Sequence, residues 1–272
     1  MRAGLELWAR DTGREIVLLD DGSRAEVAAA VHAQLAELGC NPVLGPYGSD
    51  TTRAVALARS GKVVWNHGAA ADDVQRLPGV VSLPTPASRY LVALARVAAE
   101  LGAPRIAAFT APGPFARLAR EGLEREAPAL GVELVPDAGD ADCVLLCGPV
   151  EWEAKRFRAL ERREALFGGV SPGLPEAPHA WPDGTLAPVQ WHPDLGGPPG
   201  LADYVAAQAY AGALIATRCL ELEPADPLSA ARTLSTDTFF GGFELDETGL
   251  QTGHRLSVVR WRHDRQTLLP AR

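Results

Sequence analysis

The sequence predicts an α/β protein with two Rossmann-like lobes, each built on a parallel, doubly wound sheet. Short, β-branched apolar runs alternate along the chain with amphipathic stretches, and this order is typical of helices that connect parallel strands. The pattern begins again after Gly102-Ala103-Pro104, where we expect a second lobe to start. The 272 residues, 47% of them hydrophobic, are enough for two cores of ordinary size.

The predicted strands are short apolar runs, and the predicted helices have apolar residues at helical spacing. We expect strands at 16–20, 42–45, 63–66, 105–110, 132–135, 143–147, 165–170 and 186–189. We expect helices at 23–38, 51–59, 88–101, 115–126, 151–163 and 201–222. Ser23 and Glu26, at the start of the first helix, have the spacing of a capping box. Residues 239–246 and 256–261 predict a terminal β-hairpin around a turn at 247–249.

Composition and charge exclude several classes of function. The net charge is −8, and no basic stripe is interleaved with aromatic residues, which argues against nucleic-acid binding. No apolar run has the length of a membrane-spanning helix. Charged residues such as Glu6 and Arg10 interrupt the start, so it does not resemble a secretory signal, and the chain taken literally is cytoplasmic.

Metal and nucleotide sites are not expected from the spacing of histidines, cysteines and glycines. The histidines form neither H-x-H nor H-E-x-x-H, and no glycine-rich loop lies between a strand and a helix, so we expect no metal and no cofactor. Cys143 and Cys147 share one predicted strand, where about 13 Å separates them, too far for a disulfide. His67 follows a strand, where open α/β sheets bind ligands, although a loop histidine with no role fits equally well.

The segment Gly169-Val170-Ser171-Pro172-Gly173 matches the G-x-S-x-G pattern of hydrolases. In a hydrolase, the residue after the serine donates its backbone N–H to the oxyanion, and a helix follows. Pro172 has no N–H, and residues 172–200 are a loop-like stretch rich in proline and glycine. We therefore expect no enzyme, and an esterase-like hydrolase that uses Ser171 is an alternative.

The segment Gly45-Pro46-Tyr47-Gly48-Ser49-Asp50-Thr51-Thr52 predicts a binding site for a ligand carboxylate. It leads from a strand through a tight turn into a helix, whose first N–H groups lack partners within the helix and carry partial positive charge. The hydroxyls of Ser49, Thr51 and Thr52 surround this helix end. The alternative is that Ser49 or Asp50 only caps the helix.

The order of these and other motifs resembles the type I periplasmic solute-binding proteins of the branched-chain amino acid (leucine/isoleucine/valine) class. The similarity covers nearly the whole chain. Besides Gly45 to Thr52, it rests on Gly4-Leu5-Glu6-Leu7-Trp8-Ala9-Arg10-Asp11, Leu18-Leu19-Asp20-Asp21, Val64-Trp65-Asn66-His67-Gly68-Ala69-Ala70, Tyr204 to Tyr210, and Phe240-Gly241-Gly242-Phe243-Glu244-Leu245-Asp246-Glu247-Thr248-Gly249.

The resemblance implies two lobes around a ligand cleft, with a hinge that closes them over the ligand. It places the first lobe in residues 1–104 plus 191–240, and the second in residues 105–190 plus 241–272. It further implies solute capture for an ABC importer, with the importer's membrane subunits as partners and no catalysis. Such a protein is extracytoplasmic, which requires a start upstream of Met1.

The ligand-binding residues follow from the same resemblance. Ser49 would bond the ligand carboxylate together with the N–H groups that follow it, and Gly68 and Ala70 would offer backbone groups. Two loops of the second lobe, around Gly148 and around Val170, would cover the ligand. In chain order, the implied ligand-binding residues are Tyr47, Ser49, Asp50, Thr51, Thr52, His67, Gly68, Ala70, Pro149 and Ser171.

The sequence departs from that family in three places. The family's first strand is missing, because the chain begins in the first helix. The loop at 168–172 has no acid to pair a ligand ammonium, and Ala70 stands where a hydroxyl is expected. The resemblance implies a branched-chain or other amino acid as the ligand, whereas these departures favour a carboxylate without the amine, such as an aromatic acid, or a related amide. A cytoplasmic ligand-sensing regulator of the same fold, of the amide-responsive type, is the alternative to an importer component.

Overall fold

The chain crosses three times between two structural units in the computed structural model, which describes residues 1–58, 61–160, 165–175 and 181–270. Unit 1 contains Met1–Pro86 and Pro193–Arg255, and unit 2 contains Ala87–His192 and Leu256–Arg272. The first crossing comes before the predicted one at 104, because the helix after residue 89 packs on the sheet of unit 2. The other two crossings come after the predicted ones at 190 and 240.

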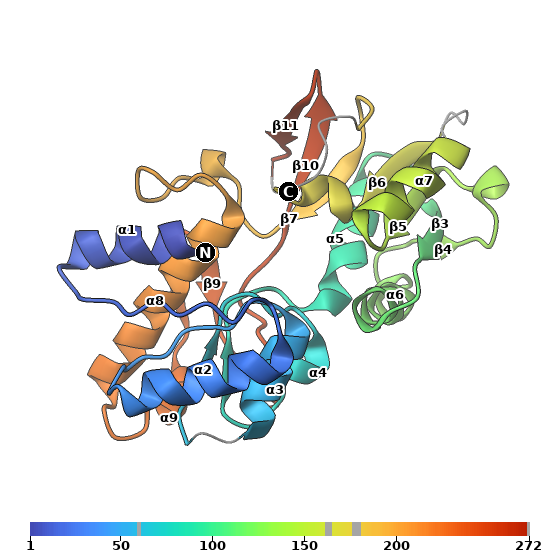
Figure 1. Cartoon of the computed structure of the whole chain (residues 1–272). Coiled ribbons are helices and arrows are strands. Elements are labelled where there is room, and N and C mark those ends of the chain that lie inside the picture. The colour runs from blue at the N-terminus through green and yellow to red at the C-terminus, as the bar shows by residue number, and fades with distance from the viewer. Residues whose placement is uncertain (59–60, 161–164, 176–180, 271–272) are drawn as a thin grey trace. The chain divides into compact units, whose positions relative to one another are not determined.

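Unit 1 has a small parallel sheet with helices around it (Figure 1). β1 pairs in parallel with β2, and Leu44 joins Trp65 by an isolated parallel bridge. β8 and β9 form a separate antiparallel pair. The elements are α1 (Arg2–Thr12), α2 (Ala25–Glu37), α3 (Ser49–Ala58), β1 (Val64–Asn66), α4 (Asp72–Gln75), β2 (Val80–Ser82), the 3-10 turn η4 (Pro193–Leu195), α8 (Tyr204–Leu222), α9 (Pro227–Thr233), β8 (Thr236–Thr238) and β9 (Gly241–Phe243).

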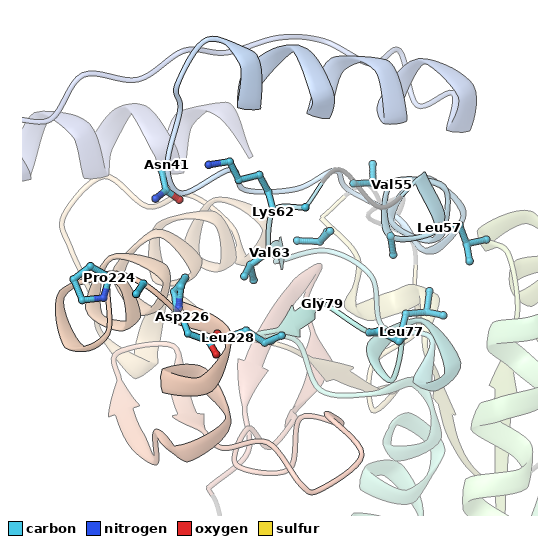
Figure 2. Close-up of a pocket in the computed structure, with 16 residues that line it drawn as sticks. Asn41, Val55, Leu57, Lys62, Val63, Leu77, Gly79, Pro224, Asp226 and Leu228 are labelled. Atoms are coloured by element: carbon cyan, nitrogen blue, oxygen red, sulfur yellow. The ribbon is translucent and has the colours of Figure 1, made fainter.

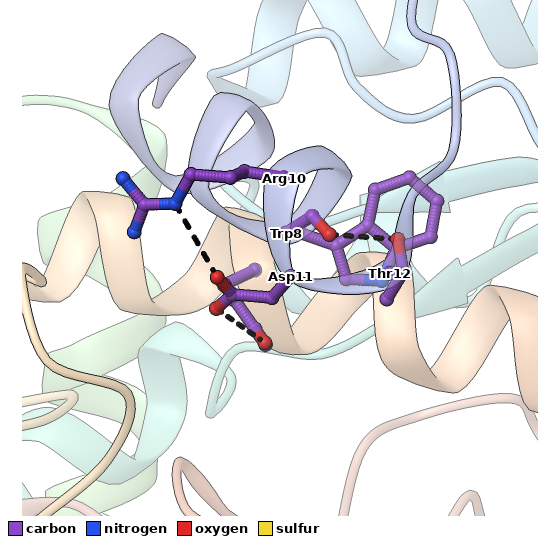
Figure 3. Close-up of polar contacts among 5 residues, drawn as sticks. Trp8, Arg10, Asp11 and Thr12 are labelled. Atoms are coloured by element: carbon purple, nitrogen blue, oxygen red, sulfur yellow. Dashed lines mark hydrogen bonds and ion pairs between the residues drawn. The ribbon is translucent and has the colours of Figure 1, made fainter.

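The helices α1 and α8 of unit 1 lie against each other, and their contact forms one hydrophobic cluster (Figure 1). Leu5 and Trp8 of α1 pack against the face of α8 that carries Tyr210. The Tyr210 hydroxyl donates to the Oδ2 atom of Asp11 over 3.2 Å. The other carboxylate oxygen of Asp11 forms an ion pair with Nε of Arg10 over 3.5 Å (Figure 3). An apolar face and one polar contact at its edge therefore fix α1 on α8.

Residues 16–20 are not a strand, and that prediction is wrong. No strand of the described chain pairs with them, so their β-branched side chains alone do not make them part of a sheet. Ile16 packs against the α1–α8 cluster, whereas Val17 remains 49% exposed. The predicted strand at 42–45 is reduced, for the same reason, to the single bridge at Leu44.

The helix predicted at 23–38 is α2, but its capping box is not formed. Arg24 is the residue before the helix, and no side chain bonds the free N–H groups there. Ser23 has a left-handed backbone with φ 56°, and its own N–H donates to the Asp21 carboxylate over 2.8 Å. The Asp20 and Asp21 carboxylates therefore order the turn before α2, and the first N–H groups of the helix have no side-chain cap.

Unit 2 is a seven-stranded sheet with the order β11-β10-β7-β6-β5-β3-β4. The five strands β4, β3, β5, β6 and β7 are parallel. β10 is antiparallel to β7, and β11 is antiparallel to β10. The elements are η1 (Ala87–Arg89), α5 (Tyr90–Glu100), β3 (Arg105–Thr110), α6 (Pro114–Glu126), β4 (Glu133–Leu134), η2 (Ala138–Asp140), β5 (Cys143–Cys147), α7 (Val150–Leu160), β6 (Leu166–Gly169), η3 (Ser171–Gly173), β7 (Leu186–Val189), β10 (Ser257–Arg262) and β11 (Arg265–Leu268).

Helices cover both faces of the sheet of unit 2. Leu145 of β5 faces a cluster formed with α5 and α6, which includes Leu94 and Leu123. The neighbouring Val144 and Leu146 face the opposite cluster, to which α7 contributes a phenylalanine. Successive residues of a strand point to opposite faces, so a wholly apolar β5 is buried on both sides. The predicted α/β class with a parallel, doubly wound sheet is confirmed.

The predicted turn at 247–249 is formed, with an antiparallel bridge from Leu245 to Gln251, but the predicted pairing of 239–246 with 256–261 is wrong. Residues 241–243 form β9, which pairs with β8 in unit 1, whereas β10 pairs with β7 and β11 in unit 2. The chain passes from one unit to the other between these strands, so they do not pair with each other. The ends of the predicted helices at 51–59 and 151–163, at residues 59 and 161–163, lie outside the described residues.

Candidate functional site

The start of α3 in unit 1 has the geometry of an anion site. Gly48, with φ 106°, turns the chain so that the helix begins at Ser49. The first helical bond inside this turn is donated by Thr52 to the Gly48 carbonyl. The N–H groups of Ser49, Asp50 and Thr51 therefore have no acceptor in the described part of the chain. Unpaired N–H groups at a helix start bind anions.

The three hydroxyls of this segment have different environments. Thr51 is buried, and its hydroxyl donates to the carbonyls of Tyr47 and Gly48 over 2.8 and 2.9 Å. Thr52 is also buried, and its hydroxyl donates to the Pro46 carbonyl. Ser49 is half-buried, and its oxygen accepts a bond instead, so its own hydrogen is available to a ligand. Of the three, the Ser49 hydroxyl is the one that can meet a carboxylate.

The loop after β1 lies beside the start of α3. Ser49 joins the two, because its hydroxyl oxygen accepts from the Ala71 N–H over 3.3 Å. The Asn66 side chain accepts from the N–H groups of Gly68 and Ala69, over 3.0 and 2.6 Å, and so fixes the loop. The Ala70 N–H has no acceptor among the described residues. In this loop, the Ala70 N–H is therefore better placed to bind a ligand oxygen than the Gly68 N–H.

The rings of Tyr47 and His67 are neighbours at that loop, with centroids 6.4 Å apart, and their exposure differs. Tyr47 is 38% exposed, and its ring covers Gly68 so closely that a side chain at Gly68 would overlap it. His67 is fully buried beneath Gly45, and neither ring nitrogen has a hydrogen-bond partner among the described residues. Burial lowers the pKa of His67 to about 4, so the ring is neutral at pH 7. Tyr47 is thus at the surface of the candidate site, and His67 packs behind it.

In unit 2, the predicted residues Pro149 and Ser171 follow the carboxyl ends of β5 and β6. Pro149 is exposed, whereas Ser171 is fully buried. The Ser171 hydroxyl donates to the Gly148 carbonyl over 3.0 Å, which connects the two loops. Because this hydroxyl is buried and bonded, and Pro172 has no N–H, the loop lacks the exposed nucleophile of a hydrolase elbow.

Sequence reasoning missed Glu153, a carboxyl group at the same end of the sheet. Its side chain is fully buried and accepts from the N–H groups of Gly148 and Ser171, over 2.8 and 3.0 Å. Burial raises the pKa of Glu153 to about 8, and the hydrogen bonds from the two loops act in the opposite direction. The sequence gave no sign that Glu153 would point inward, because acidic residues in the first turn of a helix are typical of solvated positions.

A cavity of about 680 Å³ lies elsewhere in unit 1, at the amino ends of β1 and β2 (Figure 2). Val55, Leu77 and Leu228 line it, together with the charged residues Lys62 and Asp226. Open α/β sheets bind ligands at the opposite, carboxyl ends of their strands. None of the predicted ligand-binding residues lines this cavity, so we assign it no ligand.

Neither a metal-binding cluster nor a helix able to span a membrane is present in the described part of the chain. No cluster of histidine, cysteine and carboxylate side chains could hold a metal ion there. Over the same residues, no helix has the length and apolar character needed to cross a membrane. The four cysteines, Cys40, Cys143, Cys147 and Cys219, are free thiols.

The chain has the fold of the substrate-binding proteins of ABC transporters. A substrate-binding protein from Desulfitobacterium hafniense in complex with Leu has a TM-score of 0.80 at 18% identity, over 98% of this chain and 95% of that chain. The leucine binding protein LivK from Thermotoga maritima has a TM-score of 0.77 at 16% identity, over 99% and 92%. A solute binding protein from R. palustris in complex with 4-hydroxybenzoate has a TM-score of 0.74 at 17% identity, over 97% and 89%. No family model and no curated protein matches the sequence.

Proposed function

We propose that this chain captures a small carboxylate-bearing ligand as the solute-binding component of an ABC importer. The observation that carries the proposal is the start of α3, where three unpaired N–H groups and the Ser49 hydroxyl stand beside the unpaired N–H of Ala70. Donors that are already in place bind a carboxylate without the cost of ordering them. Proteins of the same fold are recorded with Leu and with 4-hydroxybenzoate, two ligands that share a carboxylate.

The remaining ligand contacts are proposed on the resemblance of the motifs. Tyr47, with its exposed ring, would line the ligand beside the anion site. The loops around Pro149 and Ser171 would supply further ligand contacts from unit 2. We propose no catalysis, because the Ser171 hydroxyl is buried and bonded. An importer component acts outside the cytoplasm, whereas the alternative, a ligand-sensing regulator, acts inside it.

A thermal-shift screen of wild type tests the proposal. The screen compares L-leucine, L-isoleucine, benzoate, 4-hydroxybenzoate and the corresponding amides. A ligand that binds only the folded state raises the melting temperature, by an amount that grows with its concentration over Kd. We expect at least one carboxylate to raise it and its amide to raise it less. An equal effect of acid and amide would argue against an anion site.

Ser49→Ala is expected to weaken binding of the carboxylate found in that screen by about 1–3 kcal/mol, because it removes a hydrogen bond to a charged group. Isothermal titration calorimetry measures the change in Kd. Ser235→Ala, the same substitution at an exposed position of unit 1, is the matched control and should bind like wild type. Equal affinities of the Ser49 and Ser235 variants would contradict the assignment of the anion site.

A further inference from the structure

Glu153 is the one buried carboxyl group among the described residues of unit 2. It lies in the first turn of α7, and no lysine or arginine of the described chain pairs with it. The nearest charged neighbours on its helix, Glu151, Lys155 and Arg156, are exposed. Cys147 on β5 is a titratable side chain that interacts electrostatically with Glu153, and residues 170–174 after β6 carry no titratable group. The hydrogen-bond donors to Glu153 are backbone N–H groups.

Both oxygens of Glu153 bind the ends of neighbouring strands. One accepts from the N–H of Gly148, the first residue after β5, and the other from the N–H of Ser171 in the loop after β6. The Ser171 hydroxyl completes the connection by donating to the Gly148 carbonyl. The carboxyl group and this hydroxyl therefore hold the two loops in one fixed arrangement.

The packing around Glu153 leaves little room for another arrangement. A Cβ on Gly169 would lie 2.6 Å from a carboxyl oxygen of Glu153, and a Cβ on Gly148 would lie 2.7 Å from Ala111. A buried carboxyl group without a cation is costly, and an apolar side chain of similar size fills such a space at lower cost. The stability of unit 2 alone therefore does not account for a glutamate at this position.

We propose that Glu153 is a positioning residue of the ligand site, which holds the loops after β5 and β6 in the arrangement that receives the ligand. This inference rests on the proposed function, in which those loops contact the ligand. Glu153 itself is buried and makes no ligand contact. It acts through Gly148, Pro149 and Ser171.

Glu153→Gln tests the inference with little change of shape. The amide oxygen can accept one of the two N–H bonds, but the amide NH₂ is a donor and faces the other N–H. Hydrogen–deuterium exchange of the whole chain, followed by mass spectrometry, reports on the loops without any ligand. We expect at least tenfold faster exchange in peptides that cover Gly148 and Ser171, and unchanged exchange in the centre of β5.

Calorimetry then measures binding of L-leucine and 4-hydroxybenzoate to the same protein. For the probe that binds wild type, we expect at least a tenfold higher Kd for Glu153→Gln. Glu151→Gln, an exposed neighbour on the same helix turn, is the matched control and should match wild type in both measurements. Glu153→Ala leaves both N–H groups without an acceptor. Its loops should therefore exchange faster than those of Glu153→Gln, and its Kd should be higher.

Each result has a definite meaning. Unchanged loop exchange in Glu153→Gln and Glu153→Ala overturns the inference, as does faster exchange with unchanged affinity. Faster exchange over the whole of unit 2 also overturns it, because the role is then general stability. If wild type binds neither probe nor any other acid of the screen, the proposed function fails, and with it the ligand-site role of Glu153, while loop exchange still reports whether Glu153 holds the loops.

Discussion

Gly122→Ala is expected to lower the free energy of unfolding by about 3 kcal/mol, at the upper end of the usual cost of overpacking. Gly122 is buried in α6 where that helix packs on η1, and a Cβ there would overlap the carbonyl oxygen of Ser88. A backbone carbonyl cannot turn aside as the end of a flexible side chain can. The gain of about 1 kcal/mol in helix propensity from glycine to alanine does not offset that overlap.

Urea unfolding followed by circular dichroism measures this effect. Glu121→Ala is the matched control, because Glu121 is the preceding residue on α6, is exposed, and forms only a surface ion pair with Arg117. Exposed pairs of this kind contribute between about 0 and 1 kcal/mol. A Gly122→Ala protein as stable as the Glu121→Ala protein would show that α6 and η1 separate readily, contrary to the packing described.

The unfolding free energy is expected to fall as the pH rises from 6.5 to 8, and Glu153→Gln should remove most of that fall. Burial raises the pKa of Glu153 from 4.5 to about 8 in the folded chain. The folded state therefore binds this proton more tightly, and the associated stability is complete below pH 4.5 and is lost as the pH rises through 8. For one proton, the loss between pH 6.5 and 8 is about 1.5 kcal/mol.

The window is chosen so that other groups do not interfere. The pKa of His67 is lowered from 6.5 to about 4, so its contribution has the opposite sign and is lost as the pH falls through that range. Below pH 6.5 the two effects oppose each other, and above it Glu153 acts without His67. Urea titrations at pH 6.5, 7.2 and 8 compare wild type, Glu153→Gln and Glu151→Gln. Equal slopes for the three proteins would show that Glu153 titrates as an exposed carboxyl group does.

Most helices and strands of unit 2 could be predicted from the sequence, because the strands are short apolar runs that can be recognised locally. β5 is an uninterrupted apolar run, and the helices before and after it have apolar residues at helical spacing. The prediction failed at 16–20 and in the tail, where the outcome depends on which strand is available as a neighbour. Pairing partners are distant in sequence, so an apolar run of β-branched residues predicts a strand whether or not a partner exists.

The candidate site shows the same limit. The turn before α3 was predicted from its glycine, its hydroxyls and the helix that follows. Which hydroxyl remains available, Ser49 rather than Thr51, depends on backbone carbonyls that side-chain identity does not reveal. Glu153 was missed because a glutamate early in a helix is typical of a solvated position that complements the helix dipole. Only the loops that fold over it make it a buried group.

The division of each unit into two separate stretches of chain has a consequence for synthesis on the ribosome. α1 is made well before α8, the helix against which it packs, because α1 ends at Thr12 and α8 begins only at Tyr204. Until then the apolar side of α1, with Leu5, Leu7 and Trp8, has no native partner and is open to chaperones or to aggregation. The hydrophobic cluster between α1 and α8 in unit 1 therefore cannot form until α8 has been made.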